Sequence, residues 1–142
     1  MRYLIAVAAL LVPGGCVHVT EHTTAAPPGA MRCAEGEPMV ETMLFLGLAS
    51  PNGPVSEEAF ARFVETDVTP RWKEGYTILQ AQGLWYSETR KLTEREPSRV
   101  LLRFHHGSAA ASADIEAIRA AYIKAFTQDA VLRTDRMACA DF

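Results

Sequence analysis

The sequence predicts one α+β domain, in which a four-stranded antiparallel sheet carries two helices on one face. Two segments have apolar residues at helical spacing, and four others have apolar residues in short runs or at every second position. Their order is strand, helix, strand, strand, helix, strand. Placing both helices on one face of the sheet is the simplest way to bury both apolar stripes. This β-α-β-β-α-β order is the ferredoxin-like arrangement, and we assign it to residues 33–142.

The first strand and the first helix are predicted from an apolar run and the stripe that follows it. Met43–Leu48 is a short apolar run ended by the turn-forming residues 50–54, which is typical of a buried strand. Ser56 is the expected N-cap of the first helix, and Pro70 ends the helix because the residue before a proline avoids helical geometry. The apolar stripe of this helix consists of Phe60, Phe63, Val64 and Val68.

The middle of the chain predicts two strands joined by a long loop. Tyr76–Tyr86 alternates with a period of two, and Gly83 inside it indicates a bulge or the close approach of another group. Ser87–Ser98 is rich in charge and contains Pro97, so we interpret it as the loop of a wide hairpin. Arg99–His106 is the third strand. We expect its core face to carry Val100, Leu102 and Phe104, and its other face Leu101, Arg103 and His105.

The second helix and a last strand complete the domain. Ser108 or Ser112 is the expected N-cap of the helix. Ala130–Thr134 is predicted as a short final strand, and residues 137–142 as a tail. The apolar stripe of the helix consists of Ile115, Ile118, Tyr122 and Phe126.

The first sixteen residues have the pattern of an export signal. Arg2 is followed by an apolar run of about ten residues, which is too short to span a bilayer. A Pro-Gly-Gly-Cys sequence follows, and Cys16 occupies the place of the cysteine that is lipidated in bacterial lipoproteins, although Pro13 stands where Leu is usual. We therefore predict a lipoprotein-type signal peptide over residues 1–15 and a membrane anchor at Cys16. An ordinary secretory signal cut near Gly15 is the alternative.

Residues 16–32 are predicted to form a flexible tether, because Thr, Ala, Pro and Gly dominate them without a hydrophobic period. His18 and His22 within the tether could share a metal only in a helix, which the neighbouring residues disfavour, so no metal site is expected. We expect the domain to be exported and anchored in the cell envelope, facing the periplasm. By analogy with other lipoproteins of Gram-negative bacteria, Val17 after the cysteine would allow transfer to the outer membrane.

The charge balance bears on possible partners. The chain has 14 basic and 17 acidic residues, a net charge of −3, whereas proteins that bind nucleic acid usually carry a basic excess. We therefore expect no nucleic-acid partner. No catalytic or metal motif stands out, so we expect no cofactor.

Two further cysteines lie near the ends of the predicted domain. The last strand of this topology runs antiparallel beside the first, so Cys33 and Cys139 are expected at the same end of the sheet and can form a disulfide, which an exported protein would retain. Closing a loop of about one hundred residues would stabilise the domain by roughly 4 to 5 kcal/mol in the chain-entropy model. Cys16 would then be the odd cysteine, which favours its lipidation.

Several short segments resemble a known family. They are Val68-Thr69-Pro70-Arg71-Trp72, Gly75-Tyr76-Thr77-Ile78-Leu79, Gly83-Leu84-Trp85, Ser98-Arg99-Val100-Leu101-Leu102 and Gln128-Asp129-Ala130-Val131-Leu132-Arg133. Together with a cysteine near each end, they make residues 33–142 similar to the small bacterial secreted and lipoprotein domains of domain-of-unknown-function family 3574. Phe60, Lys73 and Leu84 depart from the Trp, Pro and Gln common in that family. The resemblance implies an exported bacterial protein and no established activity.

Four residues are candidates for binding a ligand. The Arg71 guanidinium could clamp an anion, although an arginine there could equally pair with a nearby acid or cap the helix end. Trp85, Tyr86 and Tyr122 could line a pocket, although such aromatic residues also form cores or dimer interfaces. No nucleophile and base are placed together, so no catalytic residue is proposed.

Three classes of function therefore stay open. The first is a non-catalytic domain that binds a small ligand or an envelope protein. The second is a small-molecule enzyme of the dimeric ferredoxin-like type, whose cavity between helices and sheet would hold Trp85, Tyr122 and an arginine. The third is a structural subunit of an envelope assembly. A homodimer is a further possible partner arrangement. A cavity lined by Trp85 and Arg71 would favour ligand binding or catalysis.

Overall fold

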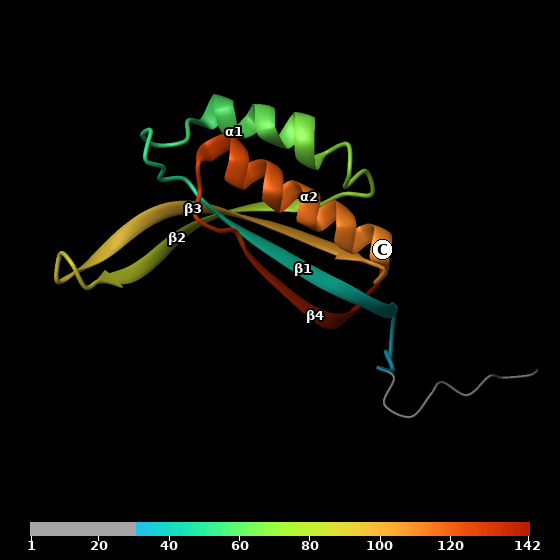
Figure 1. Cartoon of the computed structure of the whole chain (residues 1–142). Helices are drawn as coiled ribbons and strands as arrows, with labels where there is room; N and C mark the ends of the chain where they lie inside the picture. The colour runs from blue at the N-terminus through green and yellow to red at the C-terminus, as the bar shows by residue number, and fades with distance from the viewer. Residues whose placement is uncertain (1–30) are drawn as a thin grey trace, which may run out of the picture. The chain divides into compact units, whose positions relative to one another are not determined.

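The computed structural model describes residues 31–142 and places two helices on one face of a four-stranded antiparallel sheet (Figure 1). The order across the sheet is β2-β3-β1-β4, so the predicted ferredoxin-like α+β fold is confirmed. The elements are β1 (Glu37–Gly47), α1 (Glu57–Phe63), the π-helical turn η1 (Val64–Val68), β2 (Thr77–Ser87), β3 (Leu92–His105), α2 (Ala109–Phe126) and β4 (Leu132–Ala140). The predicted signal peptide, nearly all of the tether and Cys16 lie outside the described residues. No helix within 31–142 is long and apolar enough to cross a bilayer.

The strands β1 and β4 are longer than the sequence predicts. They pair from Glu37 opposite Ala140 to Phe45 opposite Leu132, so β1 begins six residues before the apolar run. The added stretch is less apolar than the predicted run, and two of its polar side chains, Glu41 and Thr42, contact β4. Glu41, for example, forms an ion pair with Arg136. Part of the predicted tail therefore belongs to β4.

The predicted hairpin loop is wrong. β2 and β3 continue as a two-stranded ribbon, which extends away from the helices at one end of the sheet (Figure 1). Only a tight turn joins them, closed by a hydrogen bond from the Lys91 N–H to the Ser87 carbonyl (2.7 Å), and Lys91 has a positive φ of 55°. Charged side chains do not interrupt these strands, because Arg95 lies exposed on the ribbon and the half-buried Glu94 pairs with Arg90. Pro97 lies in β3 opposite Gln82, and its carbonyl accepts a hydrogen bond from the Leu48 N–H at 2.9 Å.

The prediction for the core face of β3 is also wrong. Leu101 lies opposite Leu44 and belongs to the core beneath the helices, so Arg103 and His105 share its side. Val100, Leu102 and Phe104 face the side of the sheet that carries no helix. Both faces of this strand are partly apolar, and alternation alone does not tell which of them a helix covers.

The core lies between the helices and the sheet. Ser56 caps α1, its hydroxyl accepting a hydrogen bond from the Ala59 N–H at 3.2 Å, and Ser108 caps α2 in the same way through Ala111 at 3.0 Å. Ser112 is therefore not the cap. The buried core residues from the sheet, the helices and the connecting segments are Leu44, Leu46, Leu48, Phe60, Phe63, Val68, Trp72, Leu101, Ile115, Ile118, Tyr122 and Val131.

A disulfide joins Cys33 to Cys139, as the sequence analysis expects, with a Cα–Cα distance of 5.6 Å. Cys139 lies within β4, opposite Pro38 of β1. The bond therefore connects the segment before the central strand to an edge strand, across 106 positions of sequence.

Candidate functional site

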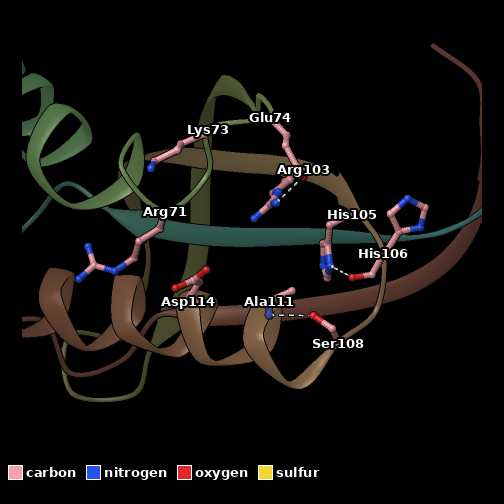
Figure 2. Close-up of a pocket in the computed structure, with 9 residues that line it drawn as sticks. All are labelled: Arg71, Lys73, Glu74, Arg103, His105, His106, Ser108, Ala111 and Asp114. Carbon is pink, nitrogen blue, oxygen red and sulfur yellow. Dashed lines mark hydrogen bonds and ion pairs between the residues drawn. The ribbon is translucent and has the colours of Figure 1, made fainter.

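A cavity of about 340 Å³ opens where β3 ends and α2 begins (Figure 2). Three segments line it: the loop after η1, the end of β3, and the first turns of α2. Most of the lining side chains are charged or can ionise. They are Arg71, Lys73, Glu74, Arg103, His105, His106, Ser108, Ala111 and Asp114.

Arg103 is the most deeply buried charged side chain of this cavity, with only 7% of the side chain exposed. Its NH2 group donates to Glu74 Oε2 at 3.0 Å, but Glu74 itself is 80% exposed. The guanidinium carbon lies 5.6 Å from the centre of the Trp72 ring. Within residues 31–142, Arg103 Nε and NH1 are buried without a hydrogen-bond partner. Each unmet buried donor costs about 1–3 kcal/mol, more for a charged group.

The position of Arg103 follows from the register of the sheet. Arg103 lies opposite Thr42 of β1, on the helix-facing side. The helices fill the middle of that side with apolar residues, whereas this end is left to the polar cavity. In Figure 2 one nitrogen end of the guanidinium points away from Glu74, toward α2. A buried cation thus faces the open space.

His105 lies beside Arg103 and is fixed by a chain of hydrogen bonds. His105 Nε2 is 2.9 Å from Thr42 Oγ1, and Thr42 Oγ1 donates its only proton to Asp135 Oδ1 at 2.5 Å. Thr42 must therefore accept from Nε2. His105 Nδ1 lies 3.1 Å from the His106 carbonyl, which can only accept. Both ring nitrogens of His105 are thus engaged in hydrogen bonds within the protein.

The other charged residues lie at the rim. Arg71 NH1 donates to the Asp67 carbonyl at 2.6 Å and lies 3.8 Å from the Asp67 carboxylate, so its guanidinium caps the end of the preceding helix. Figure 2 shows this group turned away from Arg103. Ser108 begins α2 at the cavity edge, and the N-terminus of a helix attracts negative charge. Asp114 lies one turn further along α2 and adds a negative charge to the lining.

The structure does not bring the four predicted ligand residues together. Tyr122 is fully buried in the core, and its hydroxyl donates to the Gly47 carbonyl at 2.7 Å. Burial raises the pKa of Tyr122, and the nearby Glu96 carboxylate adds to this shift. Trp85 and Tyr86 lie exposed on the β2–β3 ribbon, and only Arg71 lines the cavity described above.

The sequence analysis missed Arg103 as a site residue. The available signal was a lone arginine among the apolar residues of β3, between Leu102 and Phe104. An arginine in such a strand is either exposed to solvent or buried with a functional role. Because the wrong face of β3 was predicted to be the core face, Arg103 was expected to be exposed. Among the described residues, no group of three or more His, Cys, Asp or Glu side chains is arranged to hold a metal ion.

Comparison with solved structures shows the same fold in a phage SAM lyase. The lyase in complex with S-methyl-5'-thioadenosine matches with a TM-score of 0.52 and 13% identity, covering 78% of this chain and 96% of the lyase. The lyase in its apo state matches with a TM-score of 0.53 and 12% identity, covering 80% and 98%. At this identity the likeness concerns the fold alone.

Comparison of the sequence with curated proteins finds no match. A family model described as a protein of unknown function, DUF3574, matches residues 41–142, which include every strand and helix of the domain apart from the first residues of β1. The chain therefore belongs to the DUF3574 family.

Proposed function

We propose that this protein is an exported bacterial domain, anchored in the cell envelope by a lipid on Cys16, that binds a small anion in the Arg103 cavity without transforming it. The observation that carries the binding proposal is the buried Arg103 guanidinium with unmet donors at Nε and NH1. A carboxylate or phosphoryl oxygen at NH1 would supply a missing acceptor.

The surroundings of Arg103 favour such a ligand. The N-terminus of α2 adds positive potential at one side of the cavity. Lys73 adds an exposed cation at the rim. Asp114 would repel an anion placed against α2, so the site favours a small group held close to β3.

Binding without catalysis is favoured by the state of His105. Both of its ring nitrogens are engaged within the protein, so neither is free to take a proton from a substrate. The hydroxyl in the cavity lining, that of Ser108, accepts a hydrogen bond from the Ala111 N–H, and within residues 31–142 no hydrogen bond joins it to a base. An enzyme of the dimeric ferredoxin-like type is therefore the weaker interpretation.

The binding proposal is tested by replacing Arg103→Met, which keeps a long apolar side chain against Trp72 and removes the charge. Inorganic phosphate at one hundred times its dissociation constant should stabilise the wild type by about 2.7 kcal/mol, and this stabilisation should vanish in the variant. Urea unfolding with and without phosphate, at matched ionic strength, measures the stabilisation of the wild type and of the variant. Without anion, the variant should be at least as stable as the wild type, because it removes a buried charge with unmet donors.

A matched control is Arg99→Met, four residues earlier on the same strand and face. Arg99 pairs with Glu57 and lies over Phe60, outside the cavity, so this variant should keep the full phosphate effect. Equal phosphate stabilisation of the wild type and Arg103→Met would show that the site is not at Arg103. S-methyl-5'-thioadenosine carries no anionic group, and we expect it not to compete with phosphate.

The anchoring proposal is supported by the disulfide, because it uses Cys33 and Cys139 and leaves Cys16 as the odd cysteine of the three in the chain. Cells given labelled palmitate should incorporate the label into the wild-type protein and not into Cys16→Ser, which should also be lost from the membrane fraction. If the label is not incorporated, or if Cys16→Ser is processed and retained like the wild type, the chain has an ordinary secretory signal.

A further inference from the structure

The side of the sheet opposite the helices is apolar. Both helices pack on one side, and Figure 1 shows the other side without a covering element from the described chain. The register places Leu132, Phe45, Val100 and Leu79 in one row across all four strands. An antiparallel sheet with one face in water normally carries polar residues on that face. All four residues of this row are apolar instead.

We call this surface the open sheet face and define it by Met43, Phe45, Leu79, Leu102, Phe104 and Leu132. Leu79 is 44% exposed and Leu132 is 58% exposed, at opposite edges of the sheet. The other four are half-buried by their neighbours. On the ribbon beyond the sheet, Trp85 and Leu92 continue on the same side and are also exposed. Large contiguous apolar surface of this kind marks an interaction site.

The size of the open sheet face suits a stable protein interface. The face comprises 9 residues of β4, 11 of β1, the 8 of β3 opposite β1 and the 5 of β2 opposite those. At a strand spacing of about 4.8 Å and a rise of about 3.3 Å per residue, its area is roughly 500 Å². A standard protein–protein interface buries about 800 Å² on each partner. The exposed ribbon residues add to the available area.

The charges on this side favour a copy of the same chain. Arg136 donates to both carboxylate oxygens of Glu41, at 2.9 and 2.7 Å, so this pair is neutralised within one chain. Two copies can therefore meet without an unpaired charge at the centre of the interface. The remaining charged strand residues on this side are acidic, Glu37, Glu94 and Glu96, which disfavours an anionic lipid surface.

We infer that two copies of the chain pack their open sheet faces together and form a symmetric dimer. Sheets stacked in this way lie about 10 Å apart and bury the apolar row of each chain against that of the other. The Arg103 cavity lies on the helix side of the sheet and stays accessible in this dimer. The inference does not depend on anion binding.

Cross-linking of the full chain in its host tests the dimer. Leu79 and Ile78 are adjacent on β2, are similarly exposed at 44% and 40%, and face opposite sides of the sheet. A photoreactive p-benzoylphenylalanine at position 79 should give an adduct of twice the chain mass that contains peptides of this chain only. The same probe at position 78 should give at least about tenfold less. An adduct from position 79 to lipid or to a different protein, or equal yields from the two positions, would overturn the inference.

A charge on the open sheet face should separate the copies. With the probe at position 132, Leu79→Arg should reduce the dimer adduct at least about tenfold, whereas Ile78→Arg should leave it unchanged. Thermal unfolding of both variants reports whether they fold. If Leu79→Arg is unfolded, Leu132→Arg with the probe at position 79 replaces it. A folded variant on either strand that keeps the wild-type yield would contradict the dimer.

Discussion

At the scale of single residues, Tyr122 shows how an aromatic ligand candidate can be a core residue. Its ring packs edge-on against Phe63, with centroids 5.0 Å apart, and lies 4.7 Å from the ring of Phe126. Its hydroxyl satisfies the carbonyl of Gly47 at the end of β1. The polar end of the side chain thus ties α2 to the central strand, and it requires no ligand.

Replacing Tyr122→Phe should lower the free energy of unfolding by about 1–2 kcal/mol, because the Gly47 carbonyl loses its side-chain partner in the core. Urea denaturation measures this change. Tyr86→Phe is the control: Tyr86 is 54% exposed on the ribbon, so its change should be within about 0.5 kcal/mol of zero. Equal effects of the two substitutions would show that the Tyr122 hydroxyl contributes no stability.

The stability of the Tyr122→Phe variant should also differ from that of the wild type in its dependence on alkaline pH. The pKa of Tyr122 is raised by burial, with Glu96 adding to the shift, so the folded state holds this proton more tightly than the unfolded state. The stability that this provides is complete below the unfolded pKa of about 10 and is lost as the pH rises above it. Tyr122→Phe should therefore lose less stability than the wild type between neutral and strongly alkaline pH.

At the scale of elements, α2 ends at a strained residue. Thr127 is the C-cap and has a φ of 53°, a left-handed conformation that a β-branched side chain rarely adopts. Thr127→Gly should raise the free energy of unfolding by about 0.5–1 kcal/mol in urea denaturation. Thr127→Ala is the control, because it loses the same 3.4 Å contact with Asn52 but keeps a Cβ at positive φ. If the alanine variant gains as much as the glycine variant, the strain is not at this residue.

The predicted and observed hairpins illustrate a second point at this scale. Charge density in residues 87–98 predicted a loop, because charged residues are usually rare in buried strands. The ribbon of β2 and β3 buries little on either side, so charge does not oppose strand pairing there. A charged composition therefore indicates that a segment is exposed to solvent. It does not indicate whether the exposed segment is a loop or a strand.

At the scale of the whole molecule, the order of the elements follows from the sequence because each has its own period and boundary residues. Ser56 and Ser108 begin the two helices as predicted, and the two helix stripes include buried residues. The sequence does not show which face of β3 the helices cover, because that depends on which residues of the neighbouring strands pair with Leu101. The site was mostly missed for the same reason. Arg71 was chosen by its position near a helix end, whereas the burial of Arg103 results from tertiary packing.

The disulfide also determines how the domain responds to mechanical force. A pull on the chain at Met31 reaches Cys33 before it reaches β1, and the bond to Cys139 passes part of that tension directly into β4. Two hydrogen-bonded neighbours are then pulled at the same end, so the central strand is not peeled from the sheet alone.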